Sequence, residues 1–294
     1  MTIDPKDIPV PQLHGHLLSA VAPRPIAFAS TVDKNGNVNL SPFSFFNVFS
    51  ANPPILIFSP ARRGRDNTIK HTLENVKENA EVVVNVVSYD IVQQMSLSST
   101  EYEKGVNEFV KAGFTEVKSE RVKPPRVKEA PVSLECKVIE VKSLGEQGGA
   151  GQLVICEILL MHIADHVLDE NDRIDPNKID LVARMGGNWY ARAKGDALFE
   201  VAKPLTTIGI GVDGIPDRIR LSTVLTGNHL GMLGNVELLP TKEEVKDFEN
   251  EPEVRAIFDS FDDDENILLE LHKLAADLLN DGEVETAWKV LMME

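Results

Sequence analysis

The 294-residue sequence predicts a mainly β domain with helices, closed as a barrel, followed by an acidic helical C-terminal extension. Short apolar runs separated by turn residues fill the first part of the chain, and few helical segments interrupt them. Many short strands with few helices favour a barrel over a doubly wound parallel sheet. The last part of the chain changes to amphipathic helices. We therefore expect two domains, residues 1–204 and residues 205–294.

The elements expected in the first domain follow in chain order. An N-terminal arm contains Pro9 and Pro11 and ends in a short helix over residues 13–21. Residues 68–78 form a helix, because Ile69, Leu73 and Val76 recur at helical spacing, and residues 89–96 form another. The expected strands are residues 26–32, 38–45, 55–59, 81–87, 130–142 and 151–167.

The first two strands form a hairpin with an unusual second arm. Asn35-Gly36 between apolar runs is a strong hairpin signal. The second run then alternates hydroxyl side chains, Pro42 and aromatic residues up to Asn47, which is a poor core strand. Small hydroxyls and open backbone groups can bind a planar heterocycle, and phenylalanines exclude water from it. We expect a cofactor here.

Residues 62–72 carry three arginines and a glycine, followed by a helix start that contains threonines. A helix start offers aligned backbone amides, and nearby cations and hydroxyls add charge-assisted hydrogen bonds. The segment is therefore suited to hold a phosphate. A solvated basic loop is the alternative that composition leaves open.

The C-terminal extension holds most of the acidity. The net charge is −16, and residues 205–294 contain 20 acidic residues against 7 basic ones. Residues 241–244 read as a capping box, residues 262–280 as an amphipathic helix ended by Asp281-Gly282, and residues 284–293 as a last helix. The extension is either a cap or oligomer brace, or a docking surface for a partner protein. No basic stripe with interleaved aromatics suggests nucleic acid as a partner.

The sequence also suggests a compartment. No apolar run approaches the ~18 residues that span a bilayer, and the acidic N-terminus lacks the apolar core of a signal peptide. We therefore expect a cytoplasmic protein with no membrane partner. Cys136 and Cys156 lie in apolar strand-like surroundings, so we expect reduced core residues rather than a redox pair.

Four segments between about residue 20 and residue 200 carry a family resemblance. They are Pro23-Arg24-Pro25 through Asn47, Lys70-His71-Thr72-Leu73-Glu74-Asn75-Val76, Glu81 through Val87, and Arg184-Met185-Gly186-Gly187 with Trp189-Tyr190. In this order they resemble the flavin reductase-like family, the FMN-binding split β-barrels of Greek-key type. The family usually has Asp where this chain has His71, which leaves the role of His71 open.

The resemblance implies a set of cofactor contacts. The FMN phosphate and ribityl contacts fall on Arg62, Arg65, Lys70, His71 and Thr72. The flavin ring contacts fall on Ser30, Thr31, Asn39, Ser41, Phe43, Ser44, Phe45 and Phe46. Asn39 can instead cap a turn, and each phenylalanine can instead pack in the core. Arg184 and Tyr190 are expected to meet the nicotinamide donor.

The resemblance implies an FMN-dependent oxidoreductase that passes hydride from NAD(P)H to bound flavin and then to a small acceptor. It also implies a homodimer, and no catalytic side chain is needed beyond the flavin. One alternative is a flavoredoxin-like electron carrier that meets a protein partner through its acidic extension. Another is a non-redox flavin sensor.

Three further motifs are discounted. Gly209-Ile210-Gly211-Val212-Asp213-Gly214 spells a dinucleotide fingerprint but has no βαβ unit around it. The pairs His14/His16 and His162/His166 have metal-like spacing, but one lies in an arm and the other on a strand. We expect no metal site.

Overall fold

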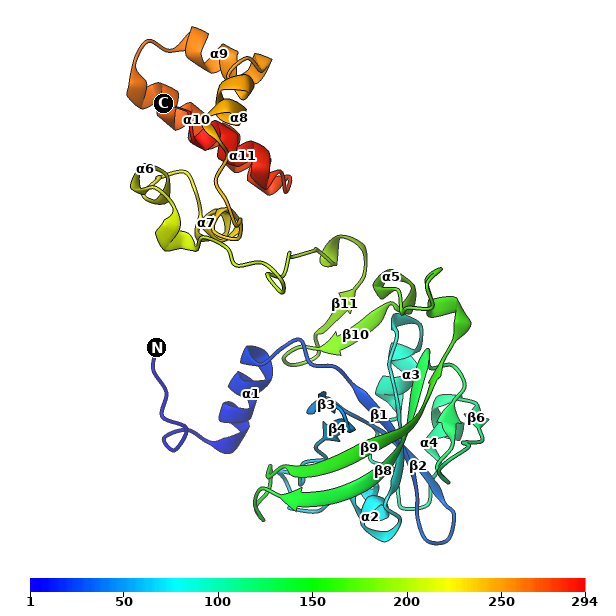
Figure 1. Cartoon of the computed structure of the whole chain (residues 1–294). Coiled ribbons are helices and arrows are strands. Elements are labelled where there is room, and N and C mark those ends of the chain that lie inside the picture. Colours follow the sequence, from blue (N-terminus) through cyan, green and yellow to red (C-terminus); the bar gives the residue numbers. More distant parts are fainter. Residues whose placement is uncertain (294) are drawn as a thin grey trace. The chain divides into compact units, whose positions relative to one another are not determined.

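The computed structural model describes residues 1–293 and contains two compact units, Met1–Phe199 and Glu200–Glu294. The first unit is the barrel and the second is helical (Figure 1). The sequence places the boundary at residues 204 and 205. Within the described residues, no helix is both long and apolar enough to cross a membrane.

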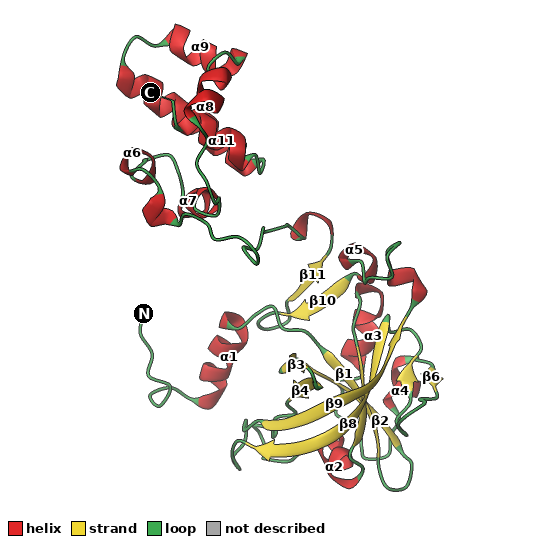
Figure 2. Ribbon diagram, in the orientation of Figure 1, coloured by secondary structure: helices red, strands yellow, loops and turns green. Residues whose placement is uncertain are grey.

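The first unit is built on a seven-stranded antiparallel sheet in the order β2-β1-β5-β8-β9-β4-β3 (Figure 2). Its strands are β1 Ala27–Val32, β2 Val38–Phe43, β3 Phe46–Ala51, β4 Pro54–Phe58, β5 Glu81–Asn85, β8 Val132–Ser143 and β9 Gln152–Ile163. β2 and β3 lie at opposite ends of this order, yet only Ser44 and Phe45 separate them in sequence. The sheet must therefore curl round, and the predicted split barrel is confirmed.

Smaller elements complete this unit. Two hairpins stand outside the main sheet: β6 Glu116–Val117 with β7 Arg126–Val127, and β10 Leu181–Arg184 with β11 Tyr190–Ala193. The helices are α1 Val10–Ala20, α2 His71–Glu78, α3 Val92–Leu97, α4 Glu108–Ala112 and α5 Pro176–Ile179.

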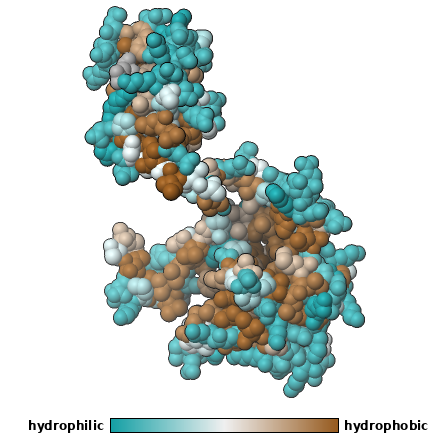
Figure 3. Space-filling view, in the orientation of Figure 1, coloured by the Kyte–Doolittle hydropathy of each residue, from teal (hydrophilic) through white to brown (hydrophobic). Residues whose placement is uncertain are grey.

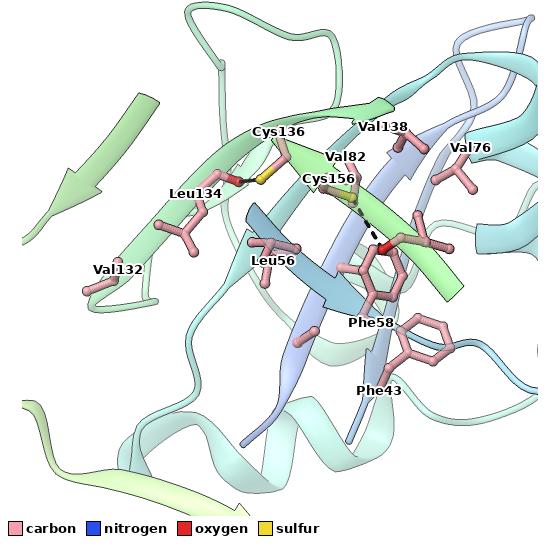
Figure 4. Packing of buried hydrophobic residues seen from close by; sticks show 14 of the residues in the cluster. Phe43, Leu56, Phe58, Val76, Val82, Val132, Leu134, Cys136, Val138 and Cys156 are labelled. Atoms are coloured by element: carbon pink, nitrogen blue, oxygen red, sulfur yellow. Dashed lines mark hydrogen bonds between the residues drawn. The ribbon is translucent and has the colours of Figure 1, made fainter. Parts of the chain in front are cut away.

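The barrel core follows from strand alternation. On β8, Val132, Leu134, Cys136 and Val138 point to one face, where they join Phe43, Leu56 and Phe58 (Figure 4). β1 is buried along its whole length because α3 and α4 pack a second cluster, which includes Phe28, Leu40 and Phe109, on its other face. Cys136 and Cys156 are free and fully buried, as predicted.

The second unit folds around its own core. Its helices are α6 Asp217–Arg220, α7 Gly227–Leu233, α8 Lys242–Phe248, α9 Pro252–Ser260, α10 Asp264–Asn280 and α11 Val284–Leu291. The fully buried Trp288 donates through Nε1 to the Leu233 carbonyl over 3.1 Å. The capping box is confirmed: the Thr241 hydroxyl accepts from the Glu244 amide, and the Glu244 carboxylate accepts from the Thr241 amide.

Several predicted elements need correction. Residues 38–45 are not one strand, because β2 ends at Phe43 and the chain crosses to the other edge of the sheet as β3. Residues 151–167 end as a strand at Ile163 and close with a 3₁₀ turn. Residues 185–189 connect the strands β10 and β11, which pair as a hairpin. The sequence prediction also missed α4, α5, α6, α7 and α9.

The discounted glycine motif has a packing role within the second unit. A Cβ at Gly209 would lie 2.4 Å from the Gly234 carbonyl oxygen, so the two backbones approach as only glycine allows. Gly211 has φ +73°, in the left-handed region. The glycines are explained by chain packing without a nucleotide.

Candidate cofactor site

A polar pocket lies beside β2, where three segments of the barrel unit meet. β2 contributes side chains, the loop that leads into α2 contributes basic groups, and the loop after α3 contributes hydroxyls. The lining residues are Asn39, Ser41, Arg63, Lys70, His71, Thr72, Ser98, Ser99, Thr100, Glu101, Tyr102 and Glu108. Five of the predicted site residues therefore come together, namely Asn39, Ser41, Lys70, His71 and Thr72.

The start of α2 lies at this pocket, because Lys70, His71 and Thr72 all line it. Lys70 is the extended residue before α2. Among residues 1–293, no side chain caps the start of this helix with a hydrogen bond. Aligned amides at a helix start attract anions. The Lys70 side chain is 31% exposed, and burial together with the nearby Arg63 charge lowers its pKa. This ammonium is poorly solvated and gains from an added anion.

A buried polar network fixes Thr72. Asn39 Nδ2 donates to Thr72 Oγ1 over 2.9 Å, and Asn75 Nδ2 donates to Thr31 Oγ1 over 3.1 Å. These four side chains tie β1 and β2 to α2. Because Thr72 Oγ1 accepts a hydrogen bond here, its own hydroxyl proton is free to donate into the pocket. Thr31 does not line the pocket and supports it through its hydrogen bond with Asn75.

His71 is a weak base in the lining of the pocket. Its side chain is partly buried, and this burial lowers its pKa. The nearby Glu74 charge opposes the shift, but the charges of Arg63, Lys104 and Lys70 add to it. The family usually has Asp at this position. A neutral imidazole, unlike that carboxylate, adds no negative charge that would repel a bound anion.

The three arginines have different roles. Arg63 lines the pocket, and its Nη1 donates to the Ile69 carbonyl over 2.8 Å. Arg62 instead braces the turn through Asn67 Oδ1 at 2.7 Å. Arg65 is 68% exposed and binds Glu101 and Asp66. The predicted contacts Arg62 and Arg65 thus lie outside the pocket lining, and Arg63 lies within it.

Sequence reasoning missed the hydroxyl loop and Glu108. Ser98, Ser99 and Thr100 follow α3 directly, and three consecutive hydroxyl residues after a helix were an available signal. Glu108 begins α4, where its Oε2 accepts from the Leu40 amide over 2.9 Å and burial raises its pKa. No sequence pattern linked Glu108 to this site.

The residues that were expected to contact the flavin ring lie in different environments. Ser41 lines the pocket, whereas Phe43 is buried with its ring centroid 5.6 Å from that of Phe58. Phe46 packs against the same core, and Phe45 is 40% exposed in the link between β2 and β3. Ser30 is buried on β1, and within the described chain its Oγ has no partner.

Arg184 and Tyr190 pair across the β10–β11 hairpin, with the guanidinium carbon 4.6 Å from the Tyr190 ring centroid. They do not line the polar pocket. The buried Arg24, which sequence reasoning overlooked, joins this hairpin to the ring segment. Its Nη2 donates to the Met185 carbonyl over 2.9 Å, and its Nε approaches Ser44 Oγ at 3.5 Å.

A roomier cavity of about 460 Å³ lies elsewhere on the barrel unit, at the ends of β8 and β9, and holds none of the predicted contacts. We favour the smaller pocket because its donor groups match an anion. Within the described residues, no group of three or more His, Cys, Asp or Glu side chains could hold a metal ion.

Comparisons with known proteins agree with the fold of the barrel unit. Residues 19–180, more than half of the chain, match the model of the flavin reductase like domain. An uncharacterized protein from Aquifex aeolicus is 40% identical over 189 residues, which are 64% of this chain and 94% of that protein.

Two solved structures are similar. Nitrilotriacetate monooxygenase component B from Bacillus cereus has a TM-score of 0.64 and 29% identity, covering 68% of this chain and 98% of that one. The 2-nitrobenzoate 2-nitroreductase NbaA from Pseudomonas fluorescens has a TM-score of 0.61 and 26% identity, covering 71% of this chain and all of that one.

Proposed function

The chain belongs to the flavin reductase-like family, and from this premise we propose an FMN-dependent oxidoreductase that accepts hydride from NAD(P)H and reduces a small acceptor. One observation carries the proposal. Lys70, Arg63 and the Thr72 hydroxyl converge at the uncapped start of α2, in the barrel of a flavin-binding family. A flavin with a terminal phosphate fits this donor set.

The residues present fit the phosphate by their chemistry. Lys70 and Arg63 supply charge, Thr72 supplies a hydroxyl proton, and the first amides of α2 supply a favourable dipole. Ser98, Ser99 and Thr100 offer further hydroxyls for the phosphate or the ribityl chain. The neutral His71 leaves this charge balance intact.

The flavin supplies the hydride chemistry when bound, and the protein binds and orients it. Ser41 and the backbone of residues 41–46 would hold the polar edge of the ring. Arg24 ties the β10–β11 hairpin to this segment, which supports Arg184 and Tyr190 as the contacts of a nicotinamide donor. No general base is required for hydride transfer.

The absorbance spectrum of the purified full-length protein tests this function, before and after anaerobic addition of NADH or NADPH. We expect the visible bands of oxidised flavin, which bleach with one of the two nucleotides. A protein that remains colourless after FMN titration would refute the cofactor. Flavin bands that persist with both nucleotides would contradict the NAD(P)H step.

The acidic second unit favours a second candidate, a flavoredoxin-like carrier that keeps FMN and exchanges electrons with a basic protein partner. Charge complementarity steers such encounters. Steady-state NAD(P)H oxidation with added FMN separates the two candidates, because a carrier would turn over only with its protein donor.

A further inference from the structure

Glu101 occupies the centre of the basic cluster in the proposed phosphate site. Its Oε1 accepts from Arg63 Nε over 3.0 Å and lies 3.9 Å from Lys70 Nζ. Its Oε2 binds Arg65. Burial raises the pKa of Glu101, but the hydrogen bond from Arg63 and the three cations outweigh it and hold that pKa below its usual value. The carboxylate is therefore ionised at neutral pH.

The pocket has little room beside this carboxylate. The free space inside is about 20 Å³, which accommodates roughly one water molecule. A phosphate group is much larger than one water. It also carries charge of the same sign as Glu101, so both cannot sit between Arg63 and Lys70.

We propose that Glu101 is an internal counter-ion that takes the place of the ligand phosphate and is exchanged for it, so that its displacement sets how tightly the site holds a phosphorylated flavin. This inference rests on the proposed function and adds to it a residue that lowers the affinity for the phosphate. Without a ligand, Glu101 neutralises cations that would otherwise repel one another across the pocket.

The exchange affects FMN and riboflavin differently. A phosphate brings up to two charges and three acceptor oxygens, so it can replace one carboxylate at Arg63 and Lys70 with a net gain. A flavin without phosphate brings no anion, cannot displace Glu101 and gains nothing from the cations. The affinity for FMN therefore contains the cost of moving Glu101, whereas the affinity for riboflavin does not.

Arg65 gives the displaced carboxylate a place to go. Arg65 is 68% exposed and binds Glu101 through the oxygen that Arg63 does not use. Glu101 can swing outward while it keeps this partner, and it gives up only the two cations that line the pocket. This accounts for an arginine that lies near the site without lining it.

The test uses full-length protein and the variants Glu101→Gln and Glu103→Gln, each titrated with FMN, riboflavin and inorganic phosphate. Glu103 is an exposed residue in the same loop, so its variant changes the net charge equally. We expect Glu101→Gln to bind FMN about tenfold more tightly and to bind inorganic phosphate more tightly as well. Riboflavin affinity should not change, and Glu103→Gln should resemble the wild type.

Other outcomes separate the two proposals. If Glu101→Gln binds FMN as the wild type does, or more weakly, Glu101 only organises the arginines and the exchange is refuted. A third outcome is that neither the wild type nor the variants bind FMN, but phosphate raises the melting temperature of Glu101→Gln more than that of Glu103→Gln. That result would support Glu101 as a counter-ion and refute the flavin function. Equal phosphate effects in both variants would refute the counter-ion.

Discussion

Lys70 and Thr72 each combine two roles at the start of α2. Lys70 ends the loop and brings a charge that burial leaves poorly solvated. Thr72 uses its oxygen for the Asn39 hydrogen bond and keeps its proton for a ligand. The basic segment and its helix start could be read from the sequence, but the choice of Arg63 over Arg62 and Arg65 could not. Loop residues follow no period, so neighbouring side chains point in unrelated directions.

Replacing both Lys70 and Thr72 by Ala should weaken FMN binding by more than tenfold, about 1.4 kcal/mol or more. The variant loses one cation and one donor at the phosphate. Fluorescence titration measures the dissociation constant, with riboflavin as the ligand that should be little affected. Lys77→Ala, an exposed change in the last turn of the same helix, is the matched control. Equal FMN affinity in the double variant would place the phosphate elsewhere.

Cys136 and Cys156 should be inert in the folded protein. Both side chains are fully buried, and burial raises the pKa of each thiol well above its usual value. The thiolate is the reactive form, so little of it exists at neutral pH. A thiol-reactive chromogenic disulfide should report no fast reaction in buffer and two thiols in denaturant. Rapid labelling of the native protein would show that the core opens readily.

At the scale of elements, the local sequence patterns predicted the central strands. They failed where the chain crosses between the edges of the sheet and at the short β10–β11 hairpin. β1, β5 and β8 are continuous apolar or alternating runs with buried partners on both sides, so their sequence reports their environment. The break between β2 and β3 arises because the chain leaves one sheet edge for the other, a non-local event. The β10–β11 hairpin is short and only partly buried, which leaves no clear alternation.

Glu135 links β8 to the loop before β7. Its fully buried carboxylate accepts from the amides of Glu120 and Arg121 and lies 2.7 Å from His162 Nε2. Burial raises the pKa of Glu135, but these hydrogen bonds outweigh it and lower that pKa. The carboxylate therefore stabilises the fold in its charged form.

Glu135→Ala should lower the free energy of unfolding by about 3 kcal/mol, because two amides and an imidazole lose their acceptor. Since the folded pKa is depressed, this contribution is present above the unfolded pKa and fades as the pH falls through the folded pKa. Urea denaturation at neutral and acidic pH measures it. Glu140→Ala, an exposed change on the same strand, should cost little. A difference that persists undiminished in acid would contradict the charged role.

At the scale of the molecule, the barrel unit exposes apolar side chains at register positions that should be internal. Val48 is paired with Leu56, which is paired with Cys156, and both partners are fully buried. Val48 itself remains 55% exposed and Phe49 is 65% exposed. Figure 3 shows apolar surface on this unit. Exposed apolar surface of this kind marks an interaction site, and the family resemblance implies that a second copy covers it.

The full-length protein should therefore behave as a homodimer in light scattering at micromolar concentration. Val48→Glu should shift it toward the monomer, because a buried charge without a partner opposes association. Val110→Glu is the control, since Val110 is 76% exposed on α4. A wild-type mass of one chain would refute the dimer, and a Val110→Glu monomer would place the interface elsewhere.

Two independent cores predict that the chain can be divided between residues 199 and 200. The barrel unit has hydrophobic clusters that contain Phe58 and Phe28, and the helical unit has its own cluster around Trp288. Each unit therefore buries its large side chains without the other. All residues of the proposed cofactor site belong to the barrel unit. A fragment of residues 1–199 should fold cooperatively and bind FMN within about threefold of the full chain, which titration and thermal melting measure. Retained FMN binding with loss of reduction by a protein partner would assign the helical unit to docking. Loss of FMN binding in a folded fragment would instead show that the helical unit contributes to the site, which no charge or pattern in residues 205–294 indicates.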